Sequence, residues 1–273
     1  MFAKLLKHEW RATKGILALL CVIILISGLT VGLSTRHLLA TESGTMAMVE
    51  PEENTAILEV MCVLLTVFGM FAIGFCCIGA FFLLISRFYK RCFTDEGYLT
   101  FTLPVNNHQI LLSSIVNTVL GMVVVALAAF LGIGMIFGLF LTAIPQEIIW
   151  ADVWVSLEEV WQQILESVQK NSMEFAMTGL SAAIGAFAVL VELMLAVTIG
   201  ALIAKKHKIL TAVAVYYGIN MVTTVVQSFF AMTVTFSQNL SWLLGSTVLV
   251  SLVMAVGGYF VMHYLINKKL NLT

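Results

Sequence analysis

Charged residues are scarce in this chain. Only 11% of its 273 residues are Asp, Glu, Lys or Arg, whereas 60% are hydrophobic, and the mean hydropathy is +1.02. Soluble globular domains carry about 25% charged residues, and disordered chains are more polar still. The composition therefore excludes both classes and predicts a membrane protein.

The motifs that usually mark an active site or a metal site are absent too. The sequence has no G-x-x-x-x-G-K-[ST] phosphate-binding loop, no protein-kinase motifs, no H-E-x-x-H and no nucleophilic-serine elbow. Neither the five cysteines nor the five histidines show zinc-ligand spacing. We therefore expect no catalytic residue, no metal site and no cofactor bound by the chain itself. The net charge of −1 gives no general attraction for nucleic acid.

Six long apolar runs are typical of membrane-spanning helices. About 20 helical residues cross the hydrocarbon of a bilayer, and a helix satisfies every backbone polar group within its own segment. None of the runs alternates every second residue, as the strands of a barrel do. The sequence predicts an all-α membrane protein, with residues 1–273 forming one domain of six transmembrane helices. The predicted spans are at about 15–33, 57–85, 110–144, 176–203, 209–234 and 243–266.

The basic residues indicate the orientation of these helices. Twelve of the 14 Lys and Arg residues fall in the N-terminal segment, in the second and fourth links between spans, and in the C-terminal tail. Most acidic residues lie in or beside the first and third links. Cytoplasmic segments of membrane proteins are enriched in Lys and Arg. We therefore expect both termini to be cytoplasmic.

Two segments outside the spans are predicted to form amphipathic helices. Residues 1–14 mix apolar with basic side chains, which favours a short interfacial helix ahead of the first span. A basic anchor that only sets the topology is the alternative. In the outer insert, 145–175, apolar residues such as Trp154 and Trp161 recur at helical spacing opposite acidic residues. This extracellular helix would cap an exit path or contact a partner, or it would be a packed connector.

The cytoplasmic link between spans two and three, residues 86–109, carries the most distinctive motif. It reads SRFYKRCFTDEGYLTFTLPVNNHQ, in which an acidic pair follows a basic cluster. Thr94 or Asp95 would cap a short helix that Pro104 ends. Such a helix would lie across the cytoplasmic surface and offer its side chains for docking.

This link resembles the connection between the same two spans in permease subunits of ATP-binding-cassette exporters of the type-2 permease family, which often runs E-G-x-L-x-x-L-P. The order of parts, with an interfacial helix, six spans and both ends inside, is similar as well. The resemblance implies that the link forms a coupling helix, which seats in a groove of an ATPase subunit. The residues that it assigns to this contact are Asp95, Glu96, Gly97, Tyr98, Leu99, Phe101 and Leu103.

The resemblance also implies partners and a location. A second permease, identical or related, would complete the path across the lipid bilayer, and separate ATPase subunits would bind ATP and Mg. The membrane would be the plasma (cytoplasmic) membrane of a bacterium. One feature departs from the family pattern. Many relatives have an outer re-entrant element between spans five and six, whereas here that link, 235–242, is short and the large outer insert follows span three.

Glu192 is an acidic residue within the fourth span. A charge at the bilayer centre costs about 3 kcal/mol on insertion scales, so such a residue is a functional candidate by default. Asn220 lies at a similar depth on the next span and is the predicted partner, with Gln227 nearer the outer face. These three residues would line a translocation path or take part in proton-linked transport. Alternatively, a protonated Glu192 is a structural hydrogen-bonding group between helices.

Small residues four apart in two spans permit close packing of helices, within the chain or across a dimer. The pairs are Gly134 with Gly138, Ser181 with Gly185, and Ala182 with Ala186.

The predicted function is that of an exporter permease that moves a hydrophobic or amphipathic substrate, such as a peptide, lipid or drug, out of the cell. Two alternatives stay open. A self-contained secondary transporter would show an internal repeat and helices broken at mid-membrane, and neither is evident in the sequence. A non-transporting immunity or signalling protein would have no ATPase partner.

Overall fold

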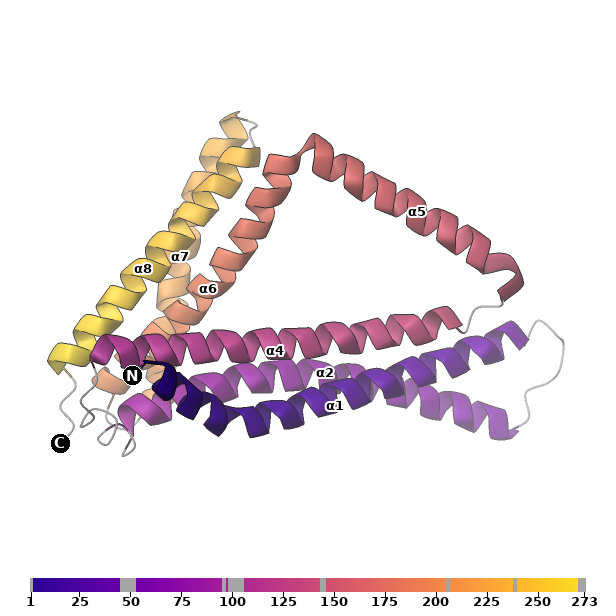
Figure 1. The fold of residues 1–273 in the computed structure, drawn as a ribbon, viewed down its shortest axis with the longest axis horizontal. Helices are drawn as coiled ribbons and strands as arrows, with labels where there is room; N and C mark the ends of the chain where they lie inside the picture. The colour runs from indigo at the N-terminus through magenta and orange to yellow at the C-terminus, as the bar shows by residue number, and fades with distance from the viewer. Residues whose placement is uncertain are drawn as a thin grey trace. The chain divides into compact units, whose positions relative to one another are not determined.

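The structure is a computed structural model that describes residues 2–44, 53–94, 97, 106–142, 146–204, 207–237 and 240–269. Within these ranges it contains helices and no strand. The seven long helices are α1 (Phe2–Gly44), α2 (Glu53–Phe93), α4 (Asn107–Thr142), α5 (Gln146–Lys170), α6 (Ser172–Ile203), α7 (Lys208–Ser237) and α8 (Leu240–Lys269) (Figure 1).

Six of the helices are long and apolar enough to cross a membrane, as predicted. These segments are Phe2–Leu39, Ala56–Phe93, Asn107–Thr142, Ser172–Ile203, Lys208–Met232 and Ser241–Lys268. Each run of apolar residues satisfies its backbone through helical hydrogen bonds, which is the requirement for a segment surrounded by lipid. The all-helical class and the six candidate spans are therefore confirmed, and the chain is a multi-pass membrane protein by its helices.

The predicted helices outside the spans have different outcomes. Residues 2–14 form the first turns of the continuous helix α1 instead of a separate short element. Helix α5 occupies most of the predicted outer insert. Its apolar residues Trp161 and Ile164 are 59% and 44% exposed, respectively. The apolar side of α5 therefore stays uncovered at these positions.

The chain divides into two compact units. Unit 1 comprises Met1–Glu9, Ile85–Val119 and Trp161–Thr273, and unit 2 comprises Trp10–Leu84 and Leu120–Val160. The helices α1, α2, α4 and α5 each contribute residues to both units.

Unit 1 is built on α6, which packs against both α7 and α8. Its core adds the end of α2 and the start of α4 to these helices. Phe88, Leu111, Met194 and Met262 are each no more than 2% exposed in this core. Side chains that are distant in sequence therefore form one closely packed apolar cluster.

Unit 2 has an apolar core shared by α1, α2 and α4. It contains Leu17 and Ile24 of α1 together with buried residues of α2 and α4. Close contact of α1 with α4 depends on a glycine, because a Cβ atom at Gly28 would lie 2.8 Å from the carbonyl oxygen of Gly132. Small residues permit this kind of close approach between helices in lipid.

The three glycines of the predicted small-residue pairs make no such contact in the described part of the chain. A Cβ atom added at Gly134, Gly138 or Gly185 would meet no atom within 4 Å. Close contacts occur instead at Gly28 with Gly132 and at Gly200, where a Cβ would lie 2.7 Å from the Cα of Ala212. Spacing alone identifies a small-residue face, but which face meets a neighbouring helix depends on the packing.

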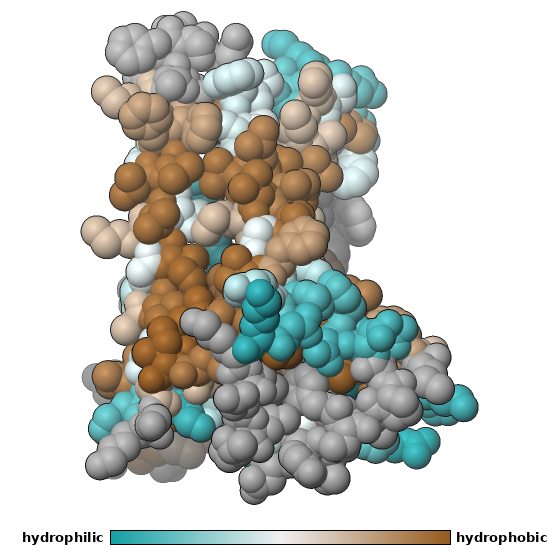
Figure 2. Space-filling view, turned by 90° about the vertical axis from the view of Figure 1, so that its left-hand side faces the viewer, coloured by the Kyte–Doolittle hydropathy of each residue, from teal (hydrophilic) through white to brown (hydrophobic). Residues whose placement is uncertain are grey.

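Large apolar side chains cover the outer faces of α7 and α8. Examples are Met221 and Phe229 on α7, at 71% and 73% exposed, and Phe260 on α8, at 61%. Figure 2 shows hydrophobic residues gathered in a broad brown band, with hydrophilic residues in teal beyond it. Soluble monomers rarely expose apolar patches of this extent, so these faces suit a lipid environment.

Candidate functional site

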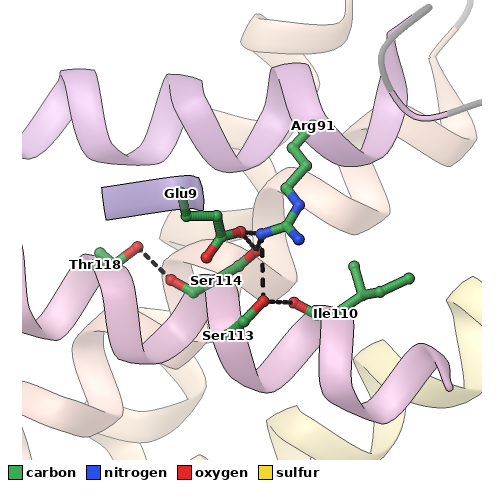
Figure 3. Close-up of polar contacts among 6 residues, drawn as sticks. All are labelled: Glu9, Arg91, Ile110, Ser113, Ser114 and Thr118. Atoms are coloured by element: carbon green, nitrogen blue, oxygen red, sulfur yellow. Dashed lines mark hydrogen bonds and ion pairs between the residues drawn. The ribbon is translucent and has the colours of Figure 1, made fainter. Parts of the chain in front are cut away.

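A buried polar cluster lies in unit 1, where the start of α1, the end of α2 and the start of α4 meet. The carboxylate of Glu9 forms an ion pair with the guanidinium of Arg91, and their side chains are only 10% and 12% exposed. Figure 3 shows these two side chains and the hydroxyls of Ser113 and Ser114 pointing toward one another. The cluster thus joins three helices through polar groups in an otherwise apolar protein.

Two adjacent serines on α4 complete the cluster. Arg91 Nη1 donates hydrogen bonds to Ser113 Oγ and Ser114 Oγ, at 3.3 Å and 3.1 Å. The Ser114 hydroxyl in turn donates to Glu9 Oε1 at 2.9 Å, and the Ser113 hydroxyl donates to the carbonyl of Ile110 at 2.9 Å. Since Ser113 and Ser114 are 0% and 4% exposed, these hydrogen bonds are shielded from water.

The ion pair makes this cluster sensitive to loss of one partner. Removing one member of a buried ion pair typically costs about 3–5 kcal/mol, because an uncompensated charge stays buried. Replacing both members by well-packed apolar residues is often neutral. The presence of the Glu9–Arg91 pair is therefore weak evidence of net stabilisation, whereas loss of one partner is expected to be costly.

The polar face of α4 continues for one more turn. Asn117 follows Ser113 by four residues and is 4% exposed. Its Oδ1 atom is buried and has no hydrogen-bond partner in the described part of the chain. The hydroxyl of Thr118, also buried, donates to the carbonyl of Ser114 at 2.9 Å. Native proteins bury few unsatisfied polar atoms, so this stretch of α4 is unusual for a membrane-spanning helix.

The cluster is next to the predicted coupling segment, residues 94–103 of the link, and Gly97 makes the connection. The Gly97 N–H donates to the Thr94 carbonyl at 2.7 Å. A Cβ atom at Gly97 would lie 2.9 Å from the carbonyl oxygen of Cys92 and 3.3 Å from that of Arg91. Only glycine fits there without displacing the backbone that carries the Arg91 side chain.

The other residues assigned to coupling lie outside the described part of the chain. They are Asp95, Glu96, Tyr98, Leu99, Phe101 and Leu103. Their side-chain positions stay predictions.

The link between α2 and α4 is also held where it enters α4. The amide of Asn107 donates to Asn267 Oδ1 on α8. His108 Nδ1 and the Tyr259 hydroxyl share a hydrogen bond of 3.0 Å, and the His108 ring stacks on His263 with centroids 3.5 Å apart. Polar contacts within unit 1 therefore hold both ends of this link. The end of α2 is bonded to α1 and α4 through Arg91, and the start of α4 is bonded to α8 through Asn107 and His108.

The structure buries Glu192 between α6 and α7, with 3% of its surface exposed. Its partner is Thr223, whose hydroxyl donates to Glu192 Oε1 at 3.4 Å and to the carbonyl of Ile219 at 2.9 Å. The predicted pairing with Asn220 is wrong, because the Asn220 amide donates instead to the Tyr216 hydroxyl at 3.4 Å. Asn220 precedes Thr223 by three residues, so a small rotation of α7 about its axis separates the two choices.

Gln227 lies four residues beyond Thr223 on α7 and is half-buried. Residues 192, 223 and 227 thus supply polar groups near the contact of α6 with α7. Among the residues that the structure describes, no group of three or more His, Cys, Asp or Glu side chains is arranged to hold a metal ion.

The polar cluster contains residues that the sequence patterns did not single out as a site. Glu9 is the only acidic residue among the first 14, where four basic residues surround it. Ser113, Ser114, Asn117 and Thr118 share one helical face of an otherwise apolar run. The lone acid and this polar face were the available signals, but spacing along the chain does not reveal that α1 meets α4.

Comparison of the chain with family models, with curated protein sequences and with solved structures found no match. The geometry of unit 1 and the sequence motifs are therefore the basis for assigning a function.

Proposed function

We propose that this protein is the permease subunit of an ATP-driven exporter of the ATP-binding-cassette class. Two such permeases, identical or related, would enclose a path across the membrane, and each would dock a separate ATPase subunit. The ATPases supply ATP binding and hydrolysis with Mg. The substrate would be hydrophobic or amphipathic, such as a peptide, a lipid or a drug.

The observation that carries the proposal is the tethered link between the second and third spans. Gly97 packs against the backbone of Cys92 and Arg91, and Arg91 is bonded to α1 and α4 through Glu9 and the two serines. A buried polar anchor of this kind would allow a docking element at this link to pass movement to the spans.

The orientation of the spans agrees with this role. With both termini cytoplasmic, the link from 94 to 106 faces the cytoplasm, where an ATPase subunit would bind it. The basic residues Lys90 and Lys268 lie near the C-terminal ends of α2 and α8. Basic residues are expected at cytoplasmic ends of spans. The membrane would be the plasma membrane of a bacterium.

Movement of the ATPases would act on the spans through residues 94–103. Closure of the ATPases on ATP would push on this segment and rock the two permeases between inward-open and outward-open states, as packed helices do in rigid-body transitions. Glu192, Thr223 and Gln227 would provide polar groups along the path. The other apolar faces would contact lipid or the second permease.

Glu192 is also the observation that favours a second candidate. A buried acid in a membrane helix is typical of proton-linked transport, and a self-contained secondary transporter would use it without an ATPase. Helix α6, which carries Glu192, is unbroken from Ser172 to Ile203, whereas binding sites of such transporters are typically formed by discontinuous helices. The exporter permease is therefore the better-supported candidate.

Purification from native membranes tests the proposal. We expect the tagged wild-type chain to copurify with an ATPase subunit that contains a phosphate-binding loop, identified by mass spectrometry. Replacing Tyr98 and Leu99 together by Asp should abolish this copurification. The matched control places two aspartates at Val155 and Val160 of α5, which are 54% and 51% exposed, and should retain the ATPase. Absence of an ATPase from the wild-type complex contradicts the proposal.

A further inference from the structure

We propose that the Glu9–Arg91 ion pair is a positioning contact that transmits movement of the coupling segment to the start of α1 as well as to α4. This inference rests on the proposed function, and it assigns to two buried charges a role beyond that of holding the fold.

The first step of the transmission is the contact of Gly97 with the last turn of α2. The space at Gly97 is so small that a single added methyl group would collide with the Cys92 carbonyl. The Gly97 N–H is also bonded to the Thr94 carbonyl. A displacement of Gly97 would therefore act on the backbone at Cys92 and Arg91, which lies close to it.

The second step is the branching of the Arg91 side chain. One guanidinium nitrogen, Nη1, contacts Glu9 on α1 and both Ser113 and Ser114 on α4. A charged group with three partners in a buried site is held more firmly than an apolar side chain, since each bond has a preferred distance and direction. Movement of Arg91 is thus passed to two helices at once.

Glu9 differs from the other charged residues near it on α1. Lys7, Arg11 and Lys14 on α1 are exposed, so water and salt screen them and their long side chains can reorient. Glu9 is buried and faces α2 and α4. Of these α1 charges, Glu9 is the one whose position depends on that of the coupling segment.

A role in transmission and a merely structural role predict different results. A structural ion pair affects how much folded complex is obtained, but each folded complex then hydrolyses ATP as the wild type does. A positioning contact affects the activity of each folded complex. The measurement must therefore be made per assembled complex and not per cell.

The experiment uses the purified complex of the full chain with its ATPase subunit in lipid nanodiscs, with ATP and Mg as the probe. The quantity measured is the ratio of ATP hydrolysis by the assembled complex to that by the free ATPase subunit. The variants are Glu9→Gln, Arg91→Gln, Ser114→Ala and the exchanged pair Glu9→Arg with Arg91→Glu. Arg11→Gln is the matched control on the exposed side of α1.

We expect the Glu9→Gln and Arg91→Gln complexes to retain the ATPase. Their ratio of ATP hydrolysis should differ from the wild-type ratio by about fivefold, in the direction of one, the ratio of an uncoupled ATPase. This factor is at the low end of measured couplings between sites. Ser114→Ala should change the ratio in the same direction by a smaller factor. The exchanged pair should restore at least half of the wild-type effect, and Arg11→Gln should match the wild type.

Wild-type ratios in both single charge variants would overturn this inference and leave the proposed function intact. Absence of the ATPase from the wild-type complex would overturn both. If the single charge variants do not assemble, Ser114→Ala and the exchanged pair decide the question, because neither leaves an uncompensated buried charge. The inference is then contradicted if Ser114→Ala has the wild-type ratio and the exchanged pair has the ratio of an uncoupled ATPase.

Discussion

Different interactions stabilise the interiors of the two compact units. Unit 1 combines an apolar core with buried polar groups, among them the Glu9–Arg91 pair and Glu192. The core of unit 2 is apolar, and its α1–α4 contact uses the close approach of Gly28 to Gly132. In lipid, apolar surface gives helices little reason to associate, so close packing and polar contacts are the available means.

The two units use these means in different places. Close packing of small residues stabilises a pair of helices without demanding one exact arrangement of charges, which suits a part of the chain that mainly spans the membrane. A buried ion pair with serine partners is costly to bury and tolerates few alternatives. Its presence beside the predicted coupling segment favours a function in that unit.

The largest loss of stability is expected from a substitution of Arg91 in unit 1. Arg91→Leu leaves the Glu9 carboxylate buried without its counter-charge, and we expect a loss of about 3–5 kcal/mol in the free energy of unfolding. Unfolding in detergent, followed by tryptophan fluorescence, measures it. Lys90→Leu, at the exposed neighbouring position, should have little effect. The double variant Glu9→Leu with Arg91→Leu should recover most of the loss; if it does not, the ion pair is not what makes Arg91 important.

The next effect concerns unit 2. Gly28→Ala places a methyl group 2.8 Å from the Gly132 carbonyl oxygen, and overpacking of this kind costs about 1–3 kcal/mol. The same unfolding assay applies. Gly134→Ala is the matched control on α4, where an added Cβ meets open space, and it should be neutral. Equal effects of the two changes would show that α1 and α4 do not meet at Gly28.

A smaller effect on stability is expected at Gly97, with a larger one on partner binding. Gly97→Ala forces a methyl group toward the Cys92 carbonyl, which we expect to cost about 1 kcal/mol and to weaken copurification of the ATPase. Gly15→Ala, with no atom within 4 Å of an added Cβ, is the control. If the Gly97→Ala variant copurifies with as much ATPase as the wild type does, Gly97 is not required for coupling.

The smallest effect on stability is expected at the α6–α7 contact. Thr223→Val removes the hydroxyl that donates to Glu192, and polar contacts between membrane helices average about 0.6 kcal/mol. Thr224→Val, on the exposed side of α7, is the control. Transport by a Glu192→Gln variant sharpens the point. Unchanged transport and expression would leave Glu192 a structural residue, whereas lost transport with unchanged stability would place it on the path.

Much of the fold could be predicted from the sequence because it depends on local properties. The apolar runs that predicted six spans are the same segments that form the six long apolar helices. The periodicity of residues such as Trp161 predicts the helix of the outer insert, and α5 confirms it. Each of these features needs only a continuous stretch of chain and the surrounding solvent.

The candidate site was predicted less completely. The motif assigns Gly97 to coupling, and the lack of space for a Cβ beside the Cys92 carbonyl explains a glycine at this position. The sequence predicts an acid within a span at Glu192, but its partner is Thr223 and not Asn220. The spacing of Gly134 and Gly138 predicts a packing face, whereas an added Cβ meets neighbouring atoms at other glycines of α4, Gly121 and Gly132. A difference of one or two residues along a helix turns a side chain to another face, and no local pattern decides that rotation.

Composition and hydropathy are enough to specify an apolar, helical membrane protein with six long candidate spans, because lipid imposes hydrophobicity and internal hydrogen bonding on each segment separately. The meeting of Glu9 with Arg91 and the serines of α4 follows from the folded structure alone. Glu9 and Arg91 are more than 80 positions apart in the sequence. Their attraction depends on their distance in space, which composition, periodicity and charge counts along the chain do not report.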